Sequence, residues 1–261
     1  MDIGKSFSFV FEDKKWIEKV LIGGILMLIP ILGPILMLGY NVELVRNVRK
    51  HDPEPLPAWD EWGKKIAEGF KLIIINIVWG IPLWILFFLM FIPMAMTGDS
   101  DSGSAIAGFF ALCFSCFTIL YAILFWFAIP GITIKFAETG EFGDGFKFGE
   151  IIDFAKKHIG QIIVVAIVSW LVYMVAGMIG MLLCGVGLLF TSFWASLVQY
   201  HMIANIGLEE MPARPLTPVP AAPPAPVQPA PPAEPAELPE ESDAAAPQDT
   251  DADQPAGEGN R

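Results

Sequence analysis

One stretch of the sequence decides the fold, and from Ile159 to Leu208 it reads IGQIIVVAIVSWLVYMVAGMIGMLLCGVGLLFTSFWASLVQYHMIANIGL. Its 50 residues include no Asp, Glu, Lys or Arg. A helix that crosses the hydrocarbon core of a bilayer needs about 20 apolar residues, so this stretch is long enough to cross twice. A single helix of this length would measure roughly 75 Å, so the chain must fold back, and the glycine-containing segment Cys184–Gly187 offers the best turn. We therefore predict transmembrane helices at residues 161–183 and 188–206.

Three other charge-free runs extend this pattern. They cover residues 20–42, 72–98 and 102–134. The last two runs each accommodate one tilted helix, at about 72–96 and 106–129. Together with the pair in the opening stretch, they predict an all-α integral membrane protein with four full transmembrane helices.

The run at 20–42 leaves two alternatives open, because Pro30, Gly33 and Pro34 interrupt its middle. Each proline removes a backbone donor and clashes with the preceding helical turn. The run is therefore either a kinked span or a re-entrant hairpin. Lys and Arg in short loops favour the cytoplasmic side of a membrane. A hairpin leaves all 14 Lys and Arg residues that precede residue 211 on one face, so we favour the hairpin.

The composition separates a membrane domain from a C-terminal tail. Hydrophobic residues make up 54% of the chain, charged residues make up 17%, and the mean hydropathy is +0.55, as is typical of a membrane protein. Fourteen of the 22 prolines lie between Pro212 and Pro255, where no aromatic residue occurs. We predict a membrane domain at 1–210 and a disordered, proline-rich acidic tail at 211–261. A net charge of −12 without a concentrated Lys/Arg cluster argues against nucleic-acid binding.

Three amphipathic segments are predicted to lie on the membrane surface as interfacial helices. In residues 59–70, apolar side chains recur at helical spacing. The i,i+4 ion pairs expected on the polar face of this segment are Asp60/Lys64 and Glu61/Lys65. Residues 148–159 have the same character, and residues 3–11 form a shorter apolar stripe. Trp and Phe side chains anchor such helices at the headgroup level, so we expect these segments to contact membrane lipids.

Several short motifs lie in the first third of the chain. They are DKKWIEK at residues 13–19, IPILGP at 29–34, LGY at 38–40, LPAWDEW at 56–62 and GFKL at 69–72. These motifs resemble the domain-of-unknown-function 4013 family, and the resemblance extends over about residues 1–207. Members of this family are uncharacterised prokaryotic multi-pass membrane proteins. The resemblance thus implies a prokaryotic multi-pass membrane protein, and it transfers no catalytic residue.

Cys113 and Cys116 form the one pair with the spacing of a redox motif. On a helix, this i,i+3 spacing places both sulfur atoms on one side, and the predicted topology puts them in the outer half of the third long helix. A thiol enzyme that passes electrons to a quinone would usually also need a second pair, and only Cys184 remains. Cysteine is also a common small apolar residue in membrane helices, so a redox role is the third of our hypotheses.

The remaining polar residues indicate no metal site and no ion pathway. His51, His158 and His201 lie at the cytoplasmic face in the predicted topology, without the HxxxH or HExxH spacing of a metal site. The apolar runs also lack the ionisable residues that ion-coupled transport requires. Their polar positions, which more often join helices than line a pathway, are Asn76, Gln161, Ser169, Thr191, Ser192, Gln199 and Asn205.

The sequence therefore predicts a non-enzymatic scaffold or accessory protein of the cytoplasmic (inner) membrane, with its basic face and C-terminal tail in the cytoplasm. The alternative is a passive transporter or channel-like component for a small uncharged solute, since proline-broken helices can expose backbone dipoles to a substrate. We predict no catalytic, cofactor-binding or metal-binding residue. The expected partners are membrane lipids and a protein at the cytoplasmic face or the tail, and a homo-oligomer is compatible with the glycine pattern.

Overall fold

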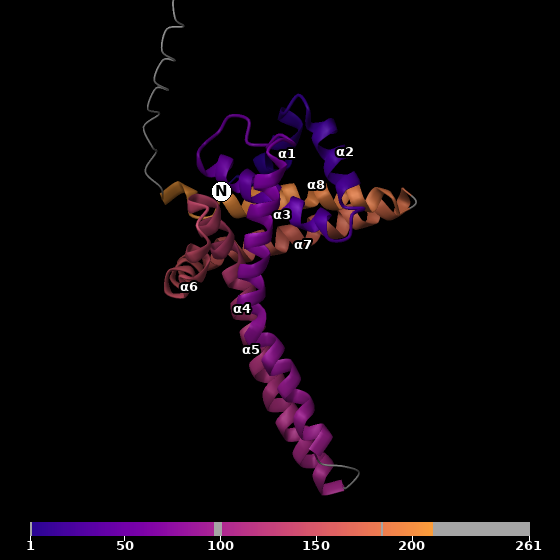
Figure 1. The fold of residues 1–261 in the computed structure, drawn as a ribbon, viewed down its shortest axis with the longest axis vertical. Coiled ribbons are helices and arrows are strands. Elements are labelled where there is room, and N and C mark those ends of the chain that lie inside the picture. The colour runs from indigo at the N-terminus through magenta and orange to yellow at the C-terminus, as the bar shows by residue number, and fades with distance from the viewer. Residues whose placement is uncertain (1, 97–100, 184, 211–261) are drawn as a thin grey trace, which may run out of the picture. The chain divides into compact units, whose positions relative to one another are not determined.

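The fold is described from a computed structural model (Figure 1) that covers residues 2–96, 101–183 and 185–210. Every regular element in these residues is a helix, so the all-α prediction is confirmed for them. The α-helices are α1 (Ile3–Glu12), α2 (Trp16–Leu26), α3 (Leu32–Arg49), α4 (Trp62–Met96), α5 (Asp101–Thr139), α6 (Phe148–Lys157), α7 (Ile159–Leu182) and α8 (Gly187–Ala204). Two 3₁₀-helices are η1 (Phe142–Phe146) and η2 (Leu208–Glu210). The predicted tail at 211–261 lies outside the described residues.

Three segments of these helices are long and apolar enough to cross a membrane. They are Trp62–Ile92 of α4, Gly108–Thr139 of α5 and Ile159–Leu182 of α7. Helix α8, which corresponds to the predicted span at 188–206, is not among them. It has 18 residues, and more than half of them are buried inside the protein. The structure therefore supports three candidate spans, and the predicted count of four is not confirmed.

Two helical hairpins organise the described residues. Helices α4 and α5 pack along each other and form the long hairpin, and α7 and α8 form the short hairpin. The chain reverses between α7 and α8 at Gly185, whose φ of 77° is accessible to glycine at little cost. This is where the sequence predicted the turn. In Figure 1 the long hairpin runs downward while the short hairpin crosses its upper end.

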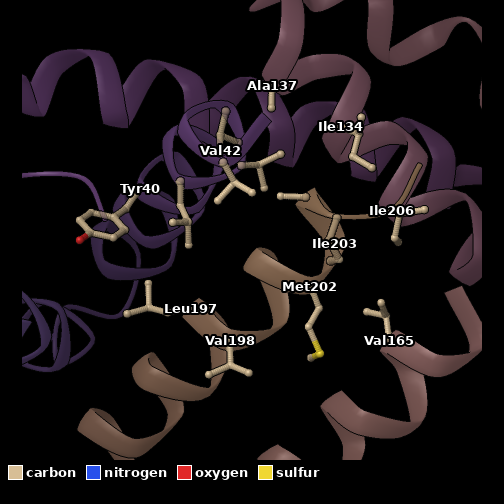
Figure 2. Close-up of a cluster of buried hydrophobic side chains, with 14 of the residues drawn as sticks. Tyr40, Val42, Ile134, Ala137, Val165, Leu197, Val198, Met202, Ile203 and Ile206 are labelled. Carbon is tan, nitrogen blue, oxygen red and sulfur yellow. The ribbon is translucent and has the colours of Figure 1, made fainter. Parts of the chain in front are cut away.

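The hydrophobic core lies where α3 and α8 meet the ends of α5 and α7 (Figure 2). Tyr40 and Val42 of α3 are fully buried there, and so are Leu197 and Val198 of α8. Helix α3 packs against α4, α5 and α8. It therefore joins the long hairpin to the short hairpin.

The run at 20–42 is not one continuous helix. Helix α2 ends at Leu26 and α3 begins at Leu32, so the helical structure breaks around Pro30. This break is the geometry that a hairpin requires, and both helices pack against α8. Neither α2 nor α3 is among the candidate spans. The insertion of this hairpin into a bilayer stays a prediction.

Two of the three predicted amphipathic segments form as separate helices. Helices α1 and α6 form close to the predicted residues 3–11 and 148–159. The segment at 59–70 is not a separate interfacial helix, because α4 begins at Trp62 and continues without interruption into the candidate span. The predicted Asp60/Lys64 and Glu61/Lys65 pairs are also wrong. Lys65 is fully buried and pairs with Glu43 and Asp60, whereas Lys64 pairs with Glu61.

Candidate functional site

An apolar cleft lies between the long hairpin and the core formed by α3 and α8. Its volume is about 840 Å³, which is within the range of small-molecule sites. Helices α4 and α5 provide most of its wall, α3 contributes Leu38, and α8 contributes Tyr200. The other lining residues are Ile73, Asn76, Ile77, Gly80, Leu83, Trp84, Phe87, Thr118, Phe125, Ile129 and Thr133. None of the residues that line the cleft carries a formal charge.

The cleft runs along the antiparallel helices α4 and α5, and its two ends have different linings. The Tyr121 hydroxyl donates a hydrogen bond to the carbonyl of Trp79 over 2.8 Å, and this bond fixes the two antiparallel helices side by side. We call the base the end where α3 and α8 pack on the long hairpin. Asn76, Thr133 and Tyr200 lie toward the base, while the opposite end toward Phe87 is lined by apolar side chains together with Thr118 and Trp84. The lining from Ile73 to Phe87 covers about four helical turns, or roughly 21 Å.

The polar groups of the cleft are only partly satisfied within the protein. The Asn76 side chain donates to the Leu72 carbonyl over 2.8 Å, and the Thr133 hydroxyl donates to the Ile129 carbonyl over 2.9 Å. These bonds leave the acceptor oxygens of both side chains available. The Tyr200 hydroxyl has no hydrogen-bond partner among the residues that the structure describes. The base of the cleft therefore offers a hydroxyl donor and several acceptor oxygens.

Buried charges hold the long hairpin in place beside the cleft. The Arg46 guanidinium of α3 binds Glu68 of α4 through two hydrogen bonds of 2.9 and 3.2 Å. Its Nε donates to the Ala137 carbonyl of α5 over 2.8 Å. One side chain thus connects three helices. Such bidentate, charge-assisted bonds fix orientation more strongly than neutral ones.

The sequence motifs at the N-terminal side interlock around a single loop. Lys19 Nζ donates to the Leu56 carbonyl over 2.7 Å, and the Trp59 indole donates to the Lys19 carbonyl over 2.8 Å. The Tyr40 hydroxyl donates to the Pro57 carbonyl over 2.7 Å, and its ring stacks on Trp59 with centroids 4.4 Å apart. These motif residues therefore connect α2, α3 and the loop before α4. Their role in the structure is architectural.

The three histidines do not converge on one site. His201 and His51 line a separate cavity of about 320 Å³, which lies beside α1. His158 lies elsewhere, against the ring of Phe154 and the backbone of Gly207. Among the described residues, no group of three His, Cys, Asp or Glu side chains has the arrangement of a metal site.

His201 joins α8 to α1. Its Nδ1 lies 2.9 Å from the Ser6 hydroxyl and 3.2 Å from the Asn205 amide, and its ring stacks on Phe9 with centroids 4.2 Å apart. Burial lowers the pKa of His201 from 6.5 to about 4, and the positive charge of Lys5 contributes to the same shift. The folded protein therefore favours the neutral imidazole.

We expect this histidine to make stability depend on pH. The unfolded chain takes up the proton near pH 6.5 and the folded chain only near pH 4, so stability is lost as the pH falls through this window. The full effect would be about 3 kcal/mol. Thermal unfolding in detergent at pH 7 and pH 5 should show a larger drop for the wild type than for His201→Asn. The control His51→Gln, at an exposed position, should keep the wild-type drop. An equal drop in His201→Asn would contradict the assignment.

The cysteines give the redox hypothesis no structural support. Cys113 is half-buried and Cys116 is exposed on α5, and both are free thiols. Cys184 lies outside the described residues, so its predicted approach to the pair is not tested. The redox hypothesis stays a prediction.

Two of the seven predicted polar positions, Gln161 and Gln199, join one element to another. Gln161 accepts a hydrogen bond from the Gly207 amide over 2.9 Å, and Gln199 accepts one from the Tyr173 hydroxyl over 3.1 Å. Asn76, Thr191 and Asn205 instead bond to the backbone carbonyl four residues before them, and the buried Ser169 hydroxyl has no hydrogen-bond partner in the described part of the chain. Asn76 also lines the cleft. Tyr200 was not predicted as a site residue. The signal that could have found it is the polar run Gln-Tyr-His at 199–201 inside a long apolar stretch.

Comparison with known proteins identifies a family. The family model described as "Protein of unknown function (DUF4013)" matches residues 22–185. The match covers residues 22–26 of α2 and all of α3, α4, α5, α6 and α7, and it stops before Tyr200. No curated protein and no solved structure matches the chain.

Proposed function

The chain belongs to the DUF4013 family. We propose that it is a non-enzymatic accessory protein of the membrane, and that it holds an uncharged apolar molecule taken from the bilayer. The cleft between α4, α5, α3 and α8 is the proposed binding site. In this proposal the protein lies in the cytoplasmic membrane, with its Lys- and Arg-rich face and its tail in the cytoplasm.

The observation that carries the proposal is the uncharged lining of a cleft built on two candidate membrane spans. A surface of this kind on α4 and α5 would face hydrocarbon rather than water. Only an uncharged molecule can fill about 840 Å³ there without leaving a charged group unpaired. The passive carrier that the sequence offers as an alternative would bind the same class of molecule. It would additionally have to release that molecule on the other side of the membrane.

A matched pair of glycine variants tests this proposal. A side chain added at Gly80 would meet no atom within 4 Å and would project into the cleft, so Gly80→Leu should fill part of the site without disturbing the fold. Gly177 on α7 is equally unobstructed but lies outside the cleft, so Gly177→Leu is the control. The measurement is photolabelling of the detergent-solubilised protein by a long-chain alkane that carries a diazirine.

We expect the wild type and Gly177→Leu to be labelled at residues of the cleft on α4 and α5. Labelling of Gly80→Leu at these residues should fall several-fold, because the added side chain occupies the space of the probe. Undiminished labelling in Gly80→Leu, or labelling spread evenly over α7, would show that the probe reports only general contact with detergent and lipid.

A further inference from the structure

The base of the cleft carries polar groups that a ligand made only of hydrocarbon would leave without hydrogen bonds. Tyr200 reaches the cleft from α8 with a hydroxyl that has no partner in the described part of the chain. Asn76 reaches it from α4, where the bond to the Leu72 carbonyl occupies its amide nitrogen and leaves its oxygen as an acceptor. A hydroxyl without a partner in an apolar site loses the hydrogen bonds that water would provide, which costs free energy.

A hydroxyl group on the ligand carries the acceptor that Tyr200 needs and the donor that Asn76 needs. Its oxygen can accept the hydrogen bond that Tyr200 offers, and its hydrogen can be donated to the Asn76 oxygen. The Thr133 oxygen, whose hydrogen is engaged by Ile129, adds a second acceptor at the same end. A charged headgroup does not fit this environment. No Lys or Arg lines the cleft to neutralise a phosphate or carboxylate, and no Asp or Glu lines it to neutralise an amine.

We propose that the ligand of the cleft is an uncharged long-chain alcohol, bound with its hydroxyl at Tyr200 and Asn76 and its chain directed toward Phe87. This inference rests on the proposed function and names the ligand class for the same site. The base of the cleft lies near the hydrogen bonds of Arg46, where α3 packs on the long hairpin. The other end of the cleft extends along α4 and α5 toward Phe87. Toward Phe87 the hydrogen of the Thr118 hydroxyl is already engaged by the Phe114 carbonyl, so the base is the end that we propose for the ligand hydroxyl.

Three diazirine probes of equal chain length test the proposal on the intact protein in detergent. They end in an alcohol, a carboxylate and a methyl group. We expect the alcohol to label the cleft of the wild type about fivefold more efficiently than the alkane, because one net hydrogen bond is worth roughly that factor. The carboxylate should label it least at pH 8.

Tyr200→Phe should remove the preference for the alcohol while alkane labelling stays unchanged, because the ring still fills its place. Tyr173→Phe is the control, since Tyr173 lies on α7 outside the cleft and its hydroxyl donates to Gln199. It should keep the preference for the alcohol.

The outcomes separate the two proposals. Equal labelling by alcohol and alkane in the wild type, stronger labelling by the carboxylate, or a preference that survives in Tyr200→Phe would overturn the alcohol assignment. The cleft would then remain an apolar site of the kind proposed above. If no probe labels the cleft more strongly than α7, and Gly80→Leu changes nothing, the proposed function itself fails.

Discussion

Gly69→Ala is expected to unfold the protein, although it adds only one methyl group. A Cβ atom built at Gly69 would lie 1.9 Å from the Ile35 carbonyl oxygen and 2.9 Å from the Gly39 nitrogen. Both are backbone atoms of α3, so no side-chain rotation can relieve the contact. At the same crossing, a Cβ built at Gly39 would lie 1.9 Å from the Lys65 carbonyl oxygen of α4. The two helices therefore touch backbone to backbone, and only glycine fits.

The expected cost of Gly69→Ala is about 3 kcal/mol or more, because α3 and α4 must move apart by more than an ångström. That movement would also pull Arg46 away from Glu68 and Lys65 away from Glu43, since both pairs connect the same two helices. The measurement is the yield of monodisperse protein in mild detergent, followed by thermal unfolding monitored by circular dichroism.

Gly80→Ala is the matched control on the same helix. A Cβ at Gly80 meets no atom within 4 Å, so the added methyl group causes no clash. Alanine also favours helix over glycine by up to about 1 kcal/mol. This variant should be as stable as the wild type or slightly more stable. Equal stability of Gly69→Ala and Gly80→Ala would refute the close crossing of α3 and α4.

The helices themselves were largely predictable from the sequence, because charge-free length and glycine turns are local signals. The reversal near Gly185 follows from such signals, and α7 begins at Ile159, two residues before the predicted start. The span predicted at 188–206 rested on the absence of charged residues, which is a weaker signal than hydropathy. Helix α8 is not among the helices that are long and apolar enough to cross a membrane, because Gln199, Tyr200 and His201 lower its mean hydropathy. It packs inside the protein against α2, α3 and α7.

The cleft could not be predicted, because its lining comes from four helices that are distant in the sequence. Leu38 and Tyr200 are separated by most of the membrane domain, and they meet only because α3 and α8 pack in the core. Asn76 was recognised as a polar position and assigned to helix contacts, since its role depends on which face of α4 is covered. The long-range ion pairs were missed for the same reason. Periodicity placed Lys65 on a solvated face, whereas α3 covers that face.

Lys65→Met is expected to be as damaging as the glycine variant, for an electrostatic reason. The Lys65 side chain has no exposed surface, and its ammonium lies 2.9 Å from the Glu43 carboxylate and 2.9 Å from the Asp60 carbonyl oxygen. The contact with Glu43 is an ion pair whose geometry falls short of a hydrogen bond. Removing the lysine leaves Glu43, which is only 16% exposed, as an uncompensated charge. Breaking a buried pair in this way typically costs about 3 to 5 kcal/mol.

The neighbouring lysine provides the control. Lys64 pairs with Glu61 over the same 2.9 Å, but the two side chains are 47% and 58% exposed. Lys64→Met should therefore change stability by no more than about 0.5 kcal/mol. Adding Glu43→Gln to Lys65→Met should recover a substantial part of the loss, because the double variant no longer buries a charge, while Asp60 is 67% exposed and is solvated by water. Two results would contradict this assignment: Lys65→Met unfolds at the same temperature as Lys64→Met, or the double variant is less stable than Lys65→Met alone. In either case the buried charge does not hold α3 to α4. The close packing of glycines at the helix crossing would then hold the two helices by itself.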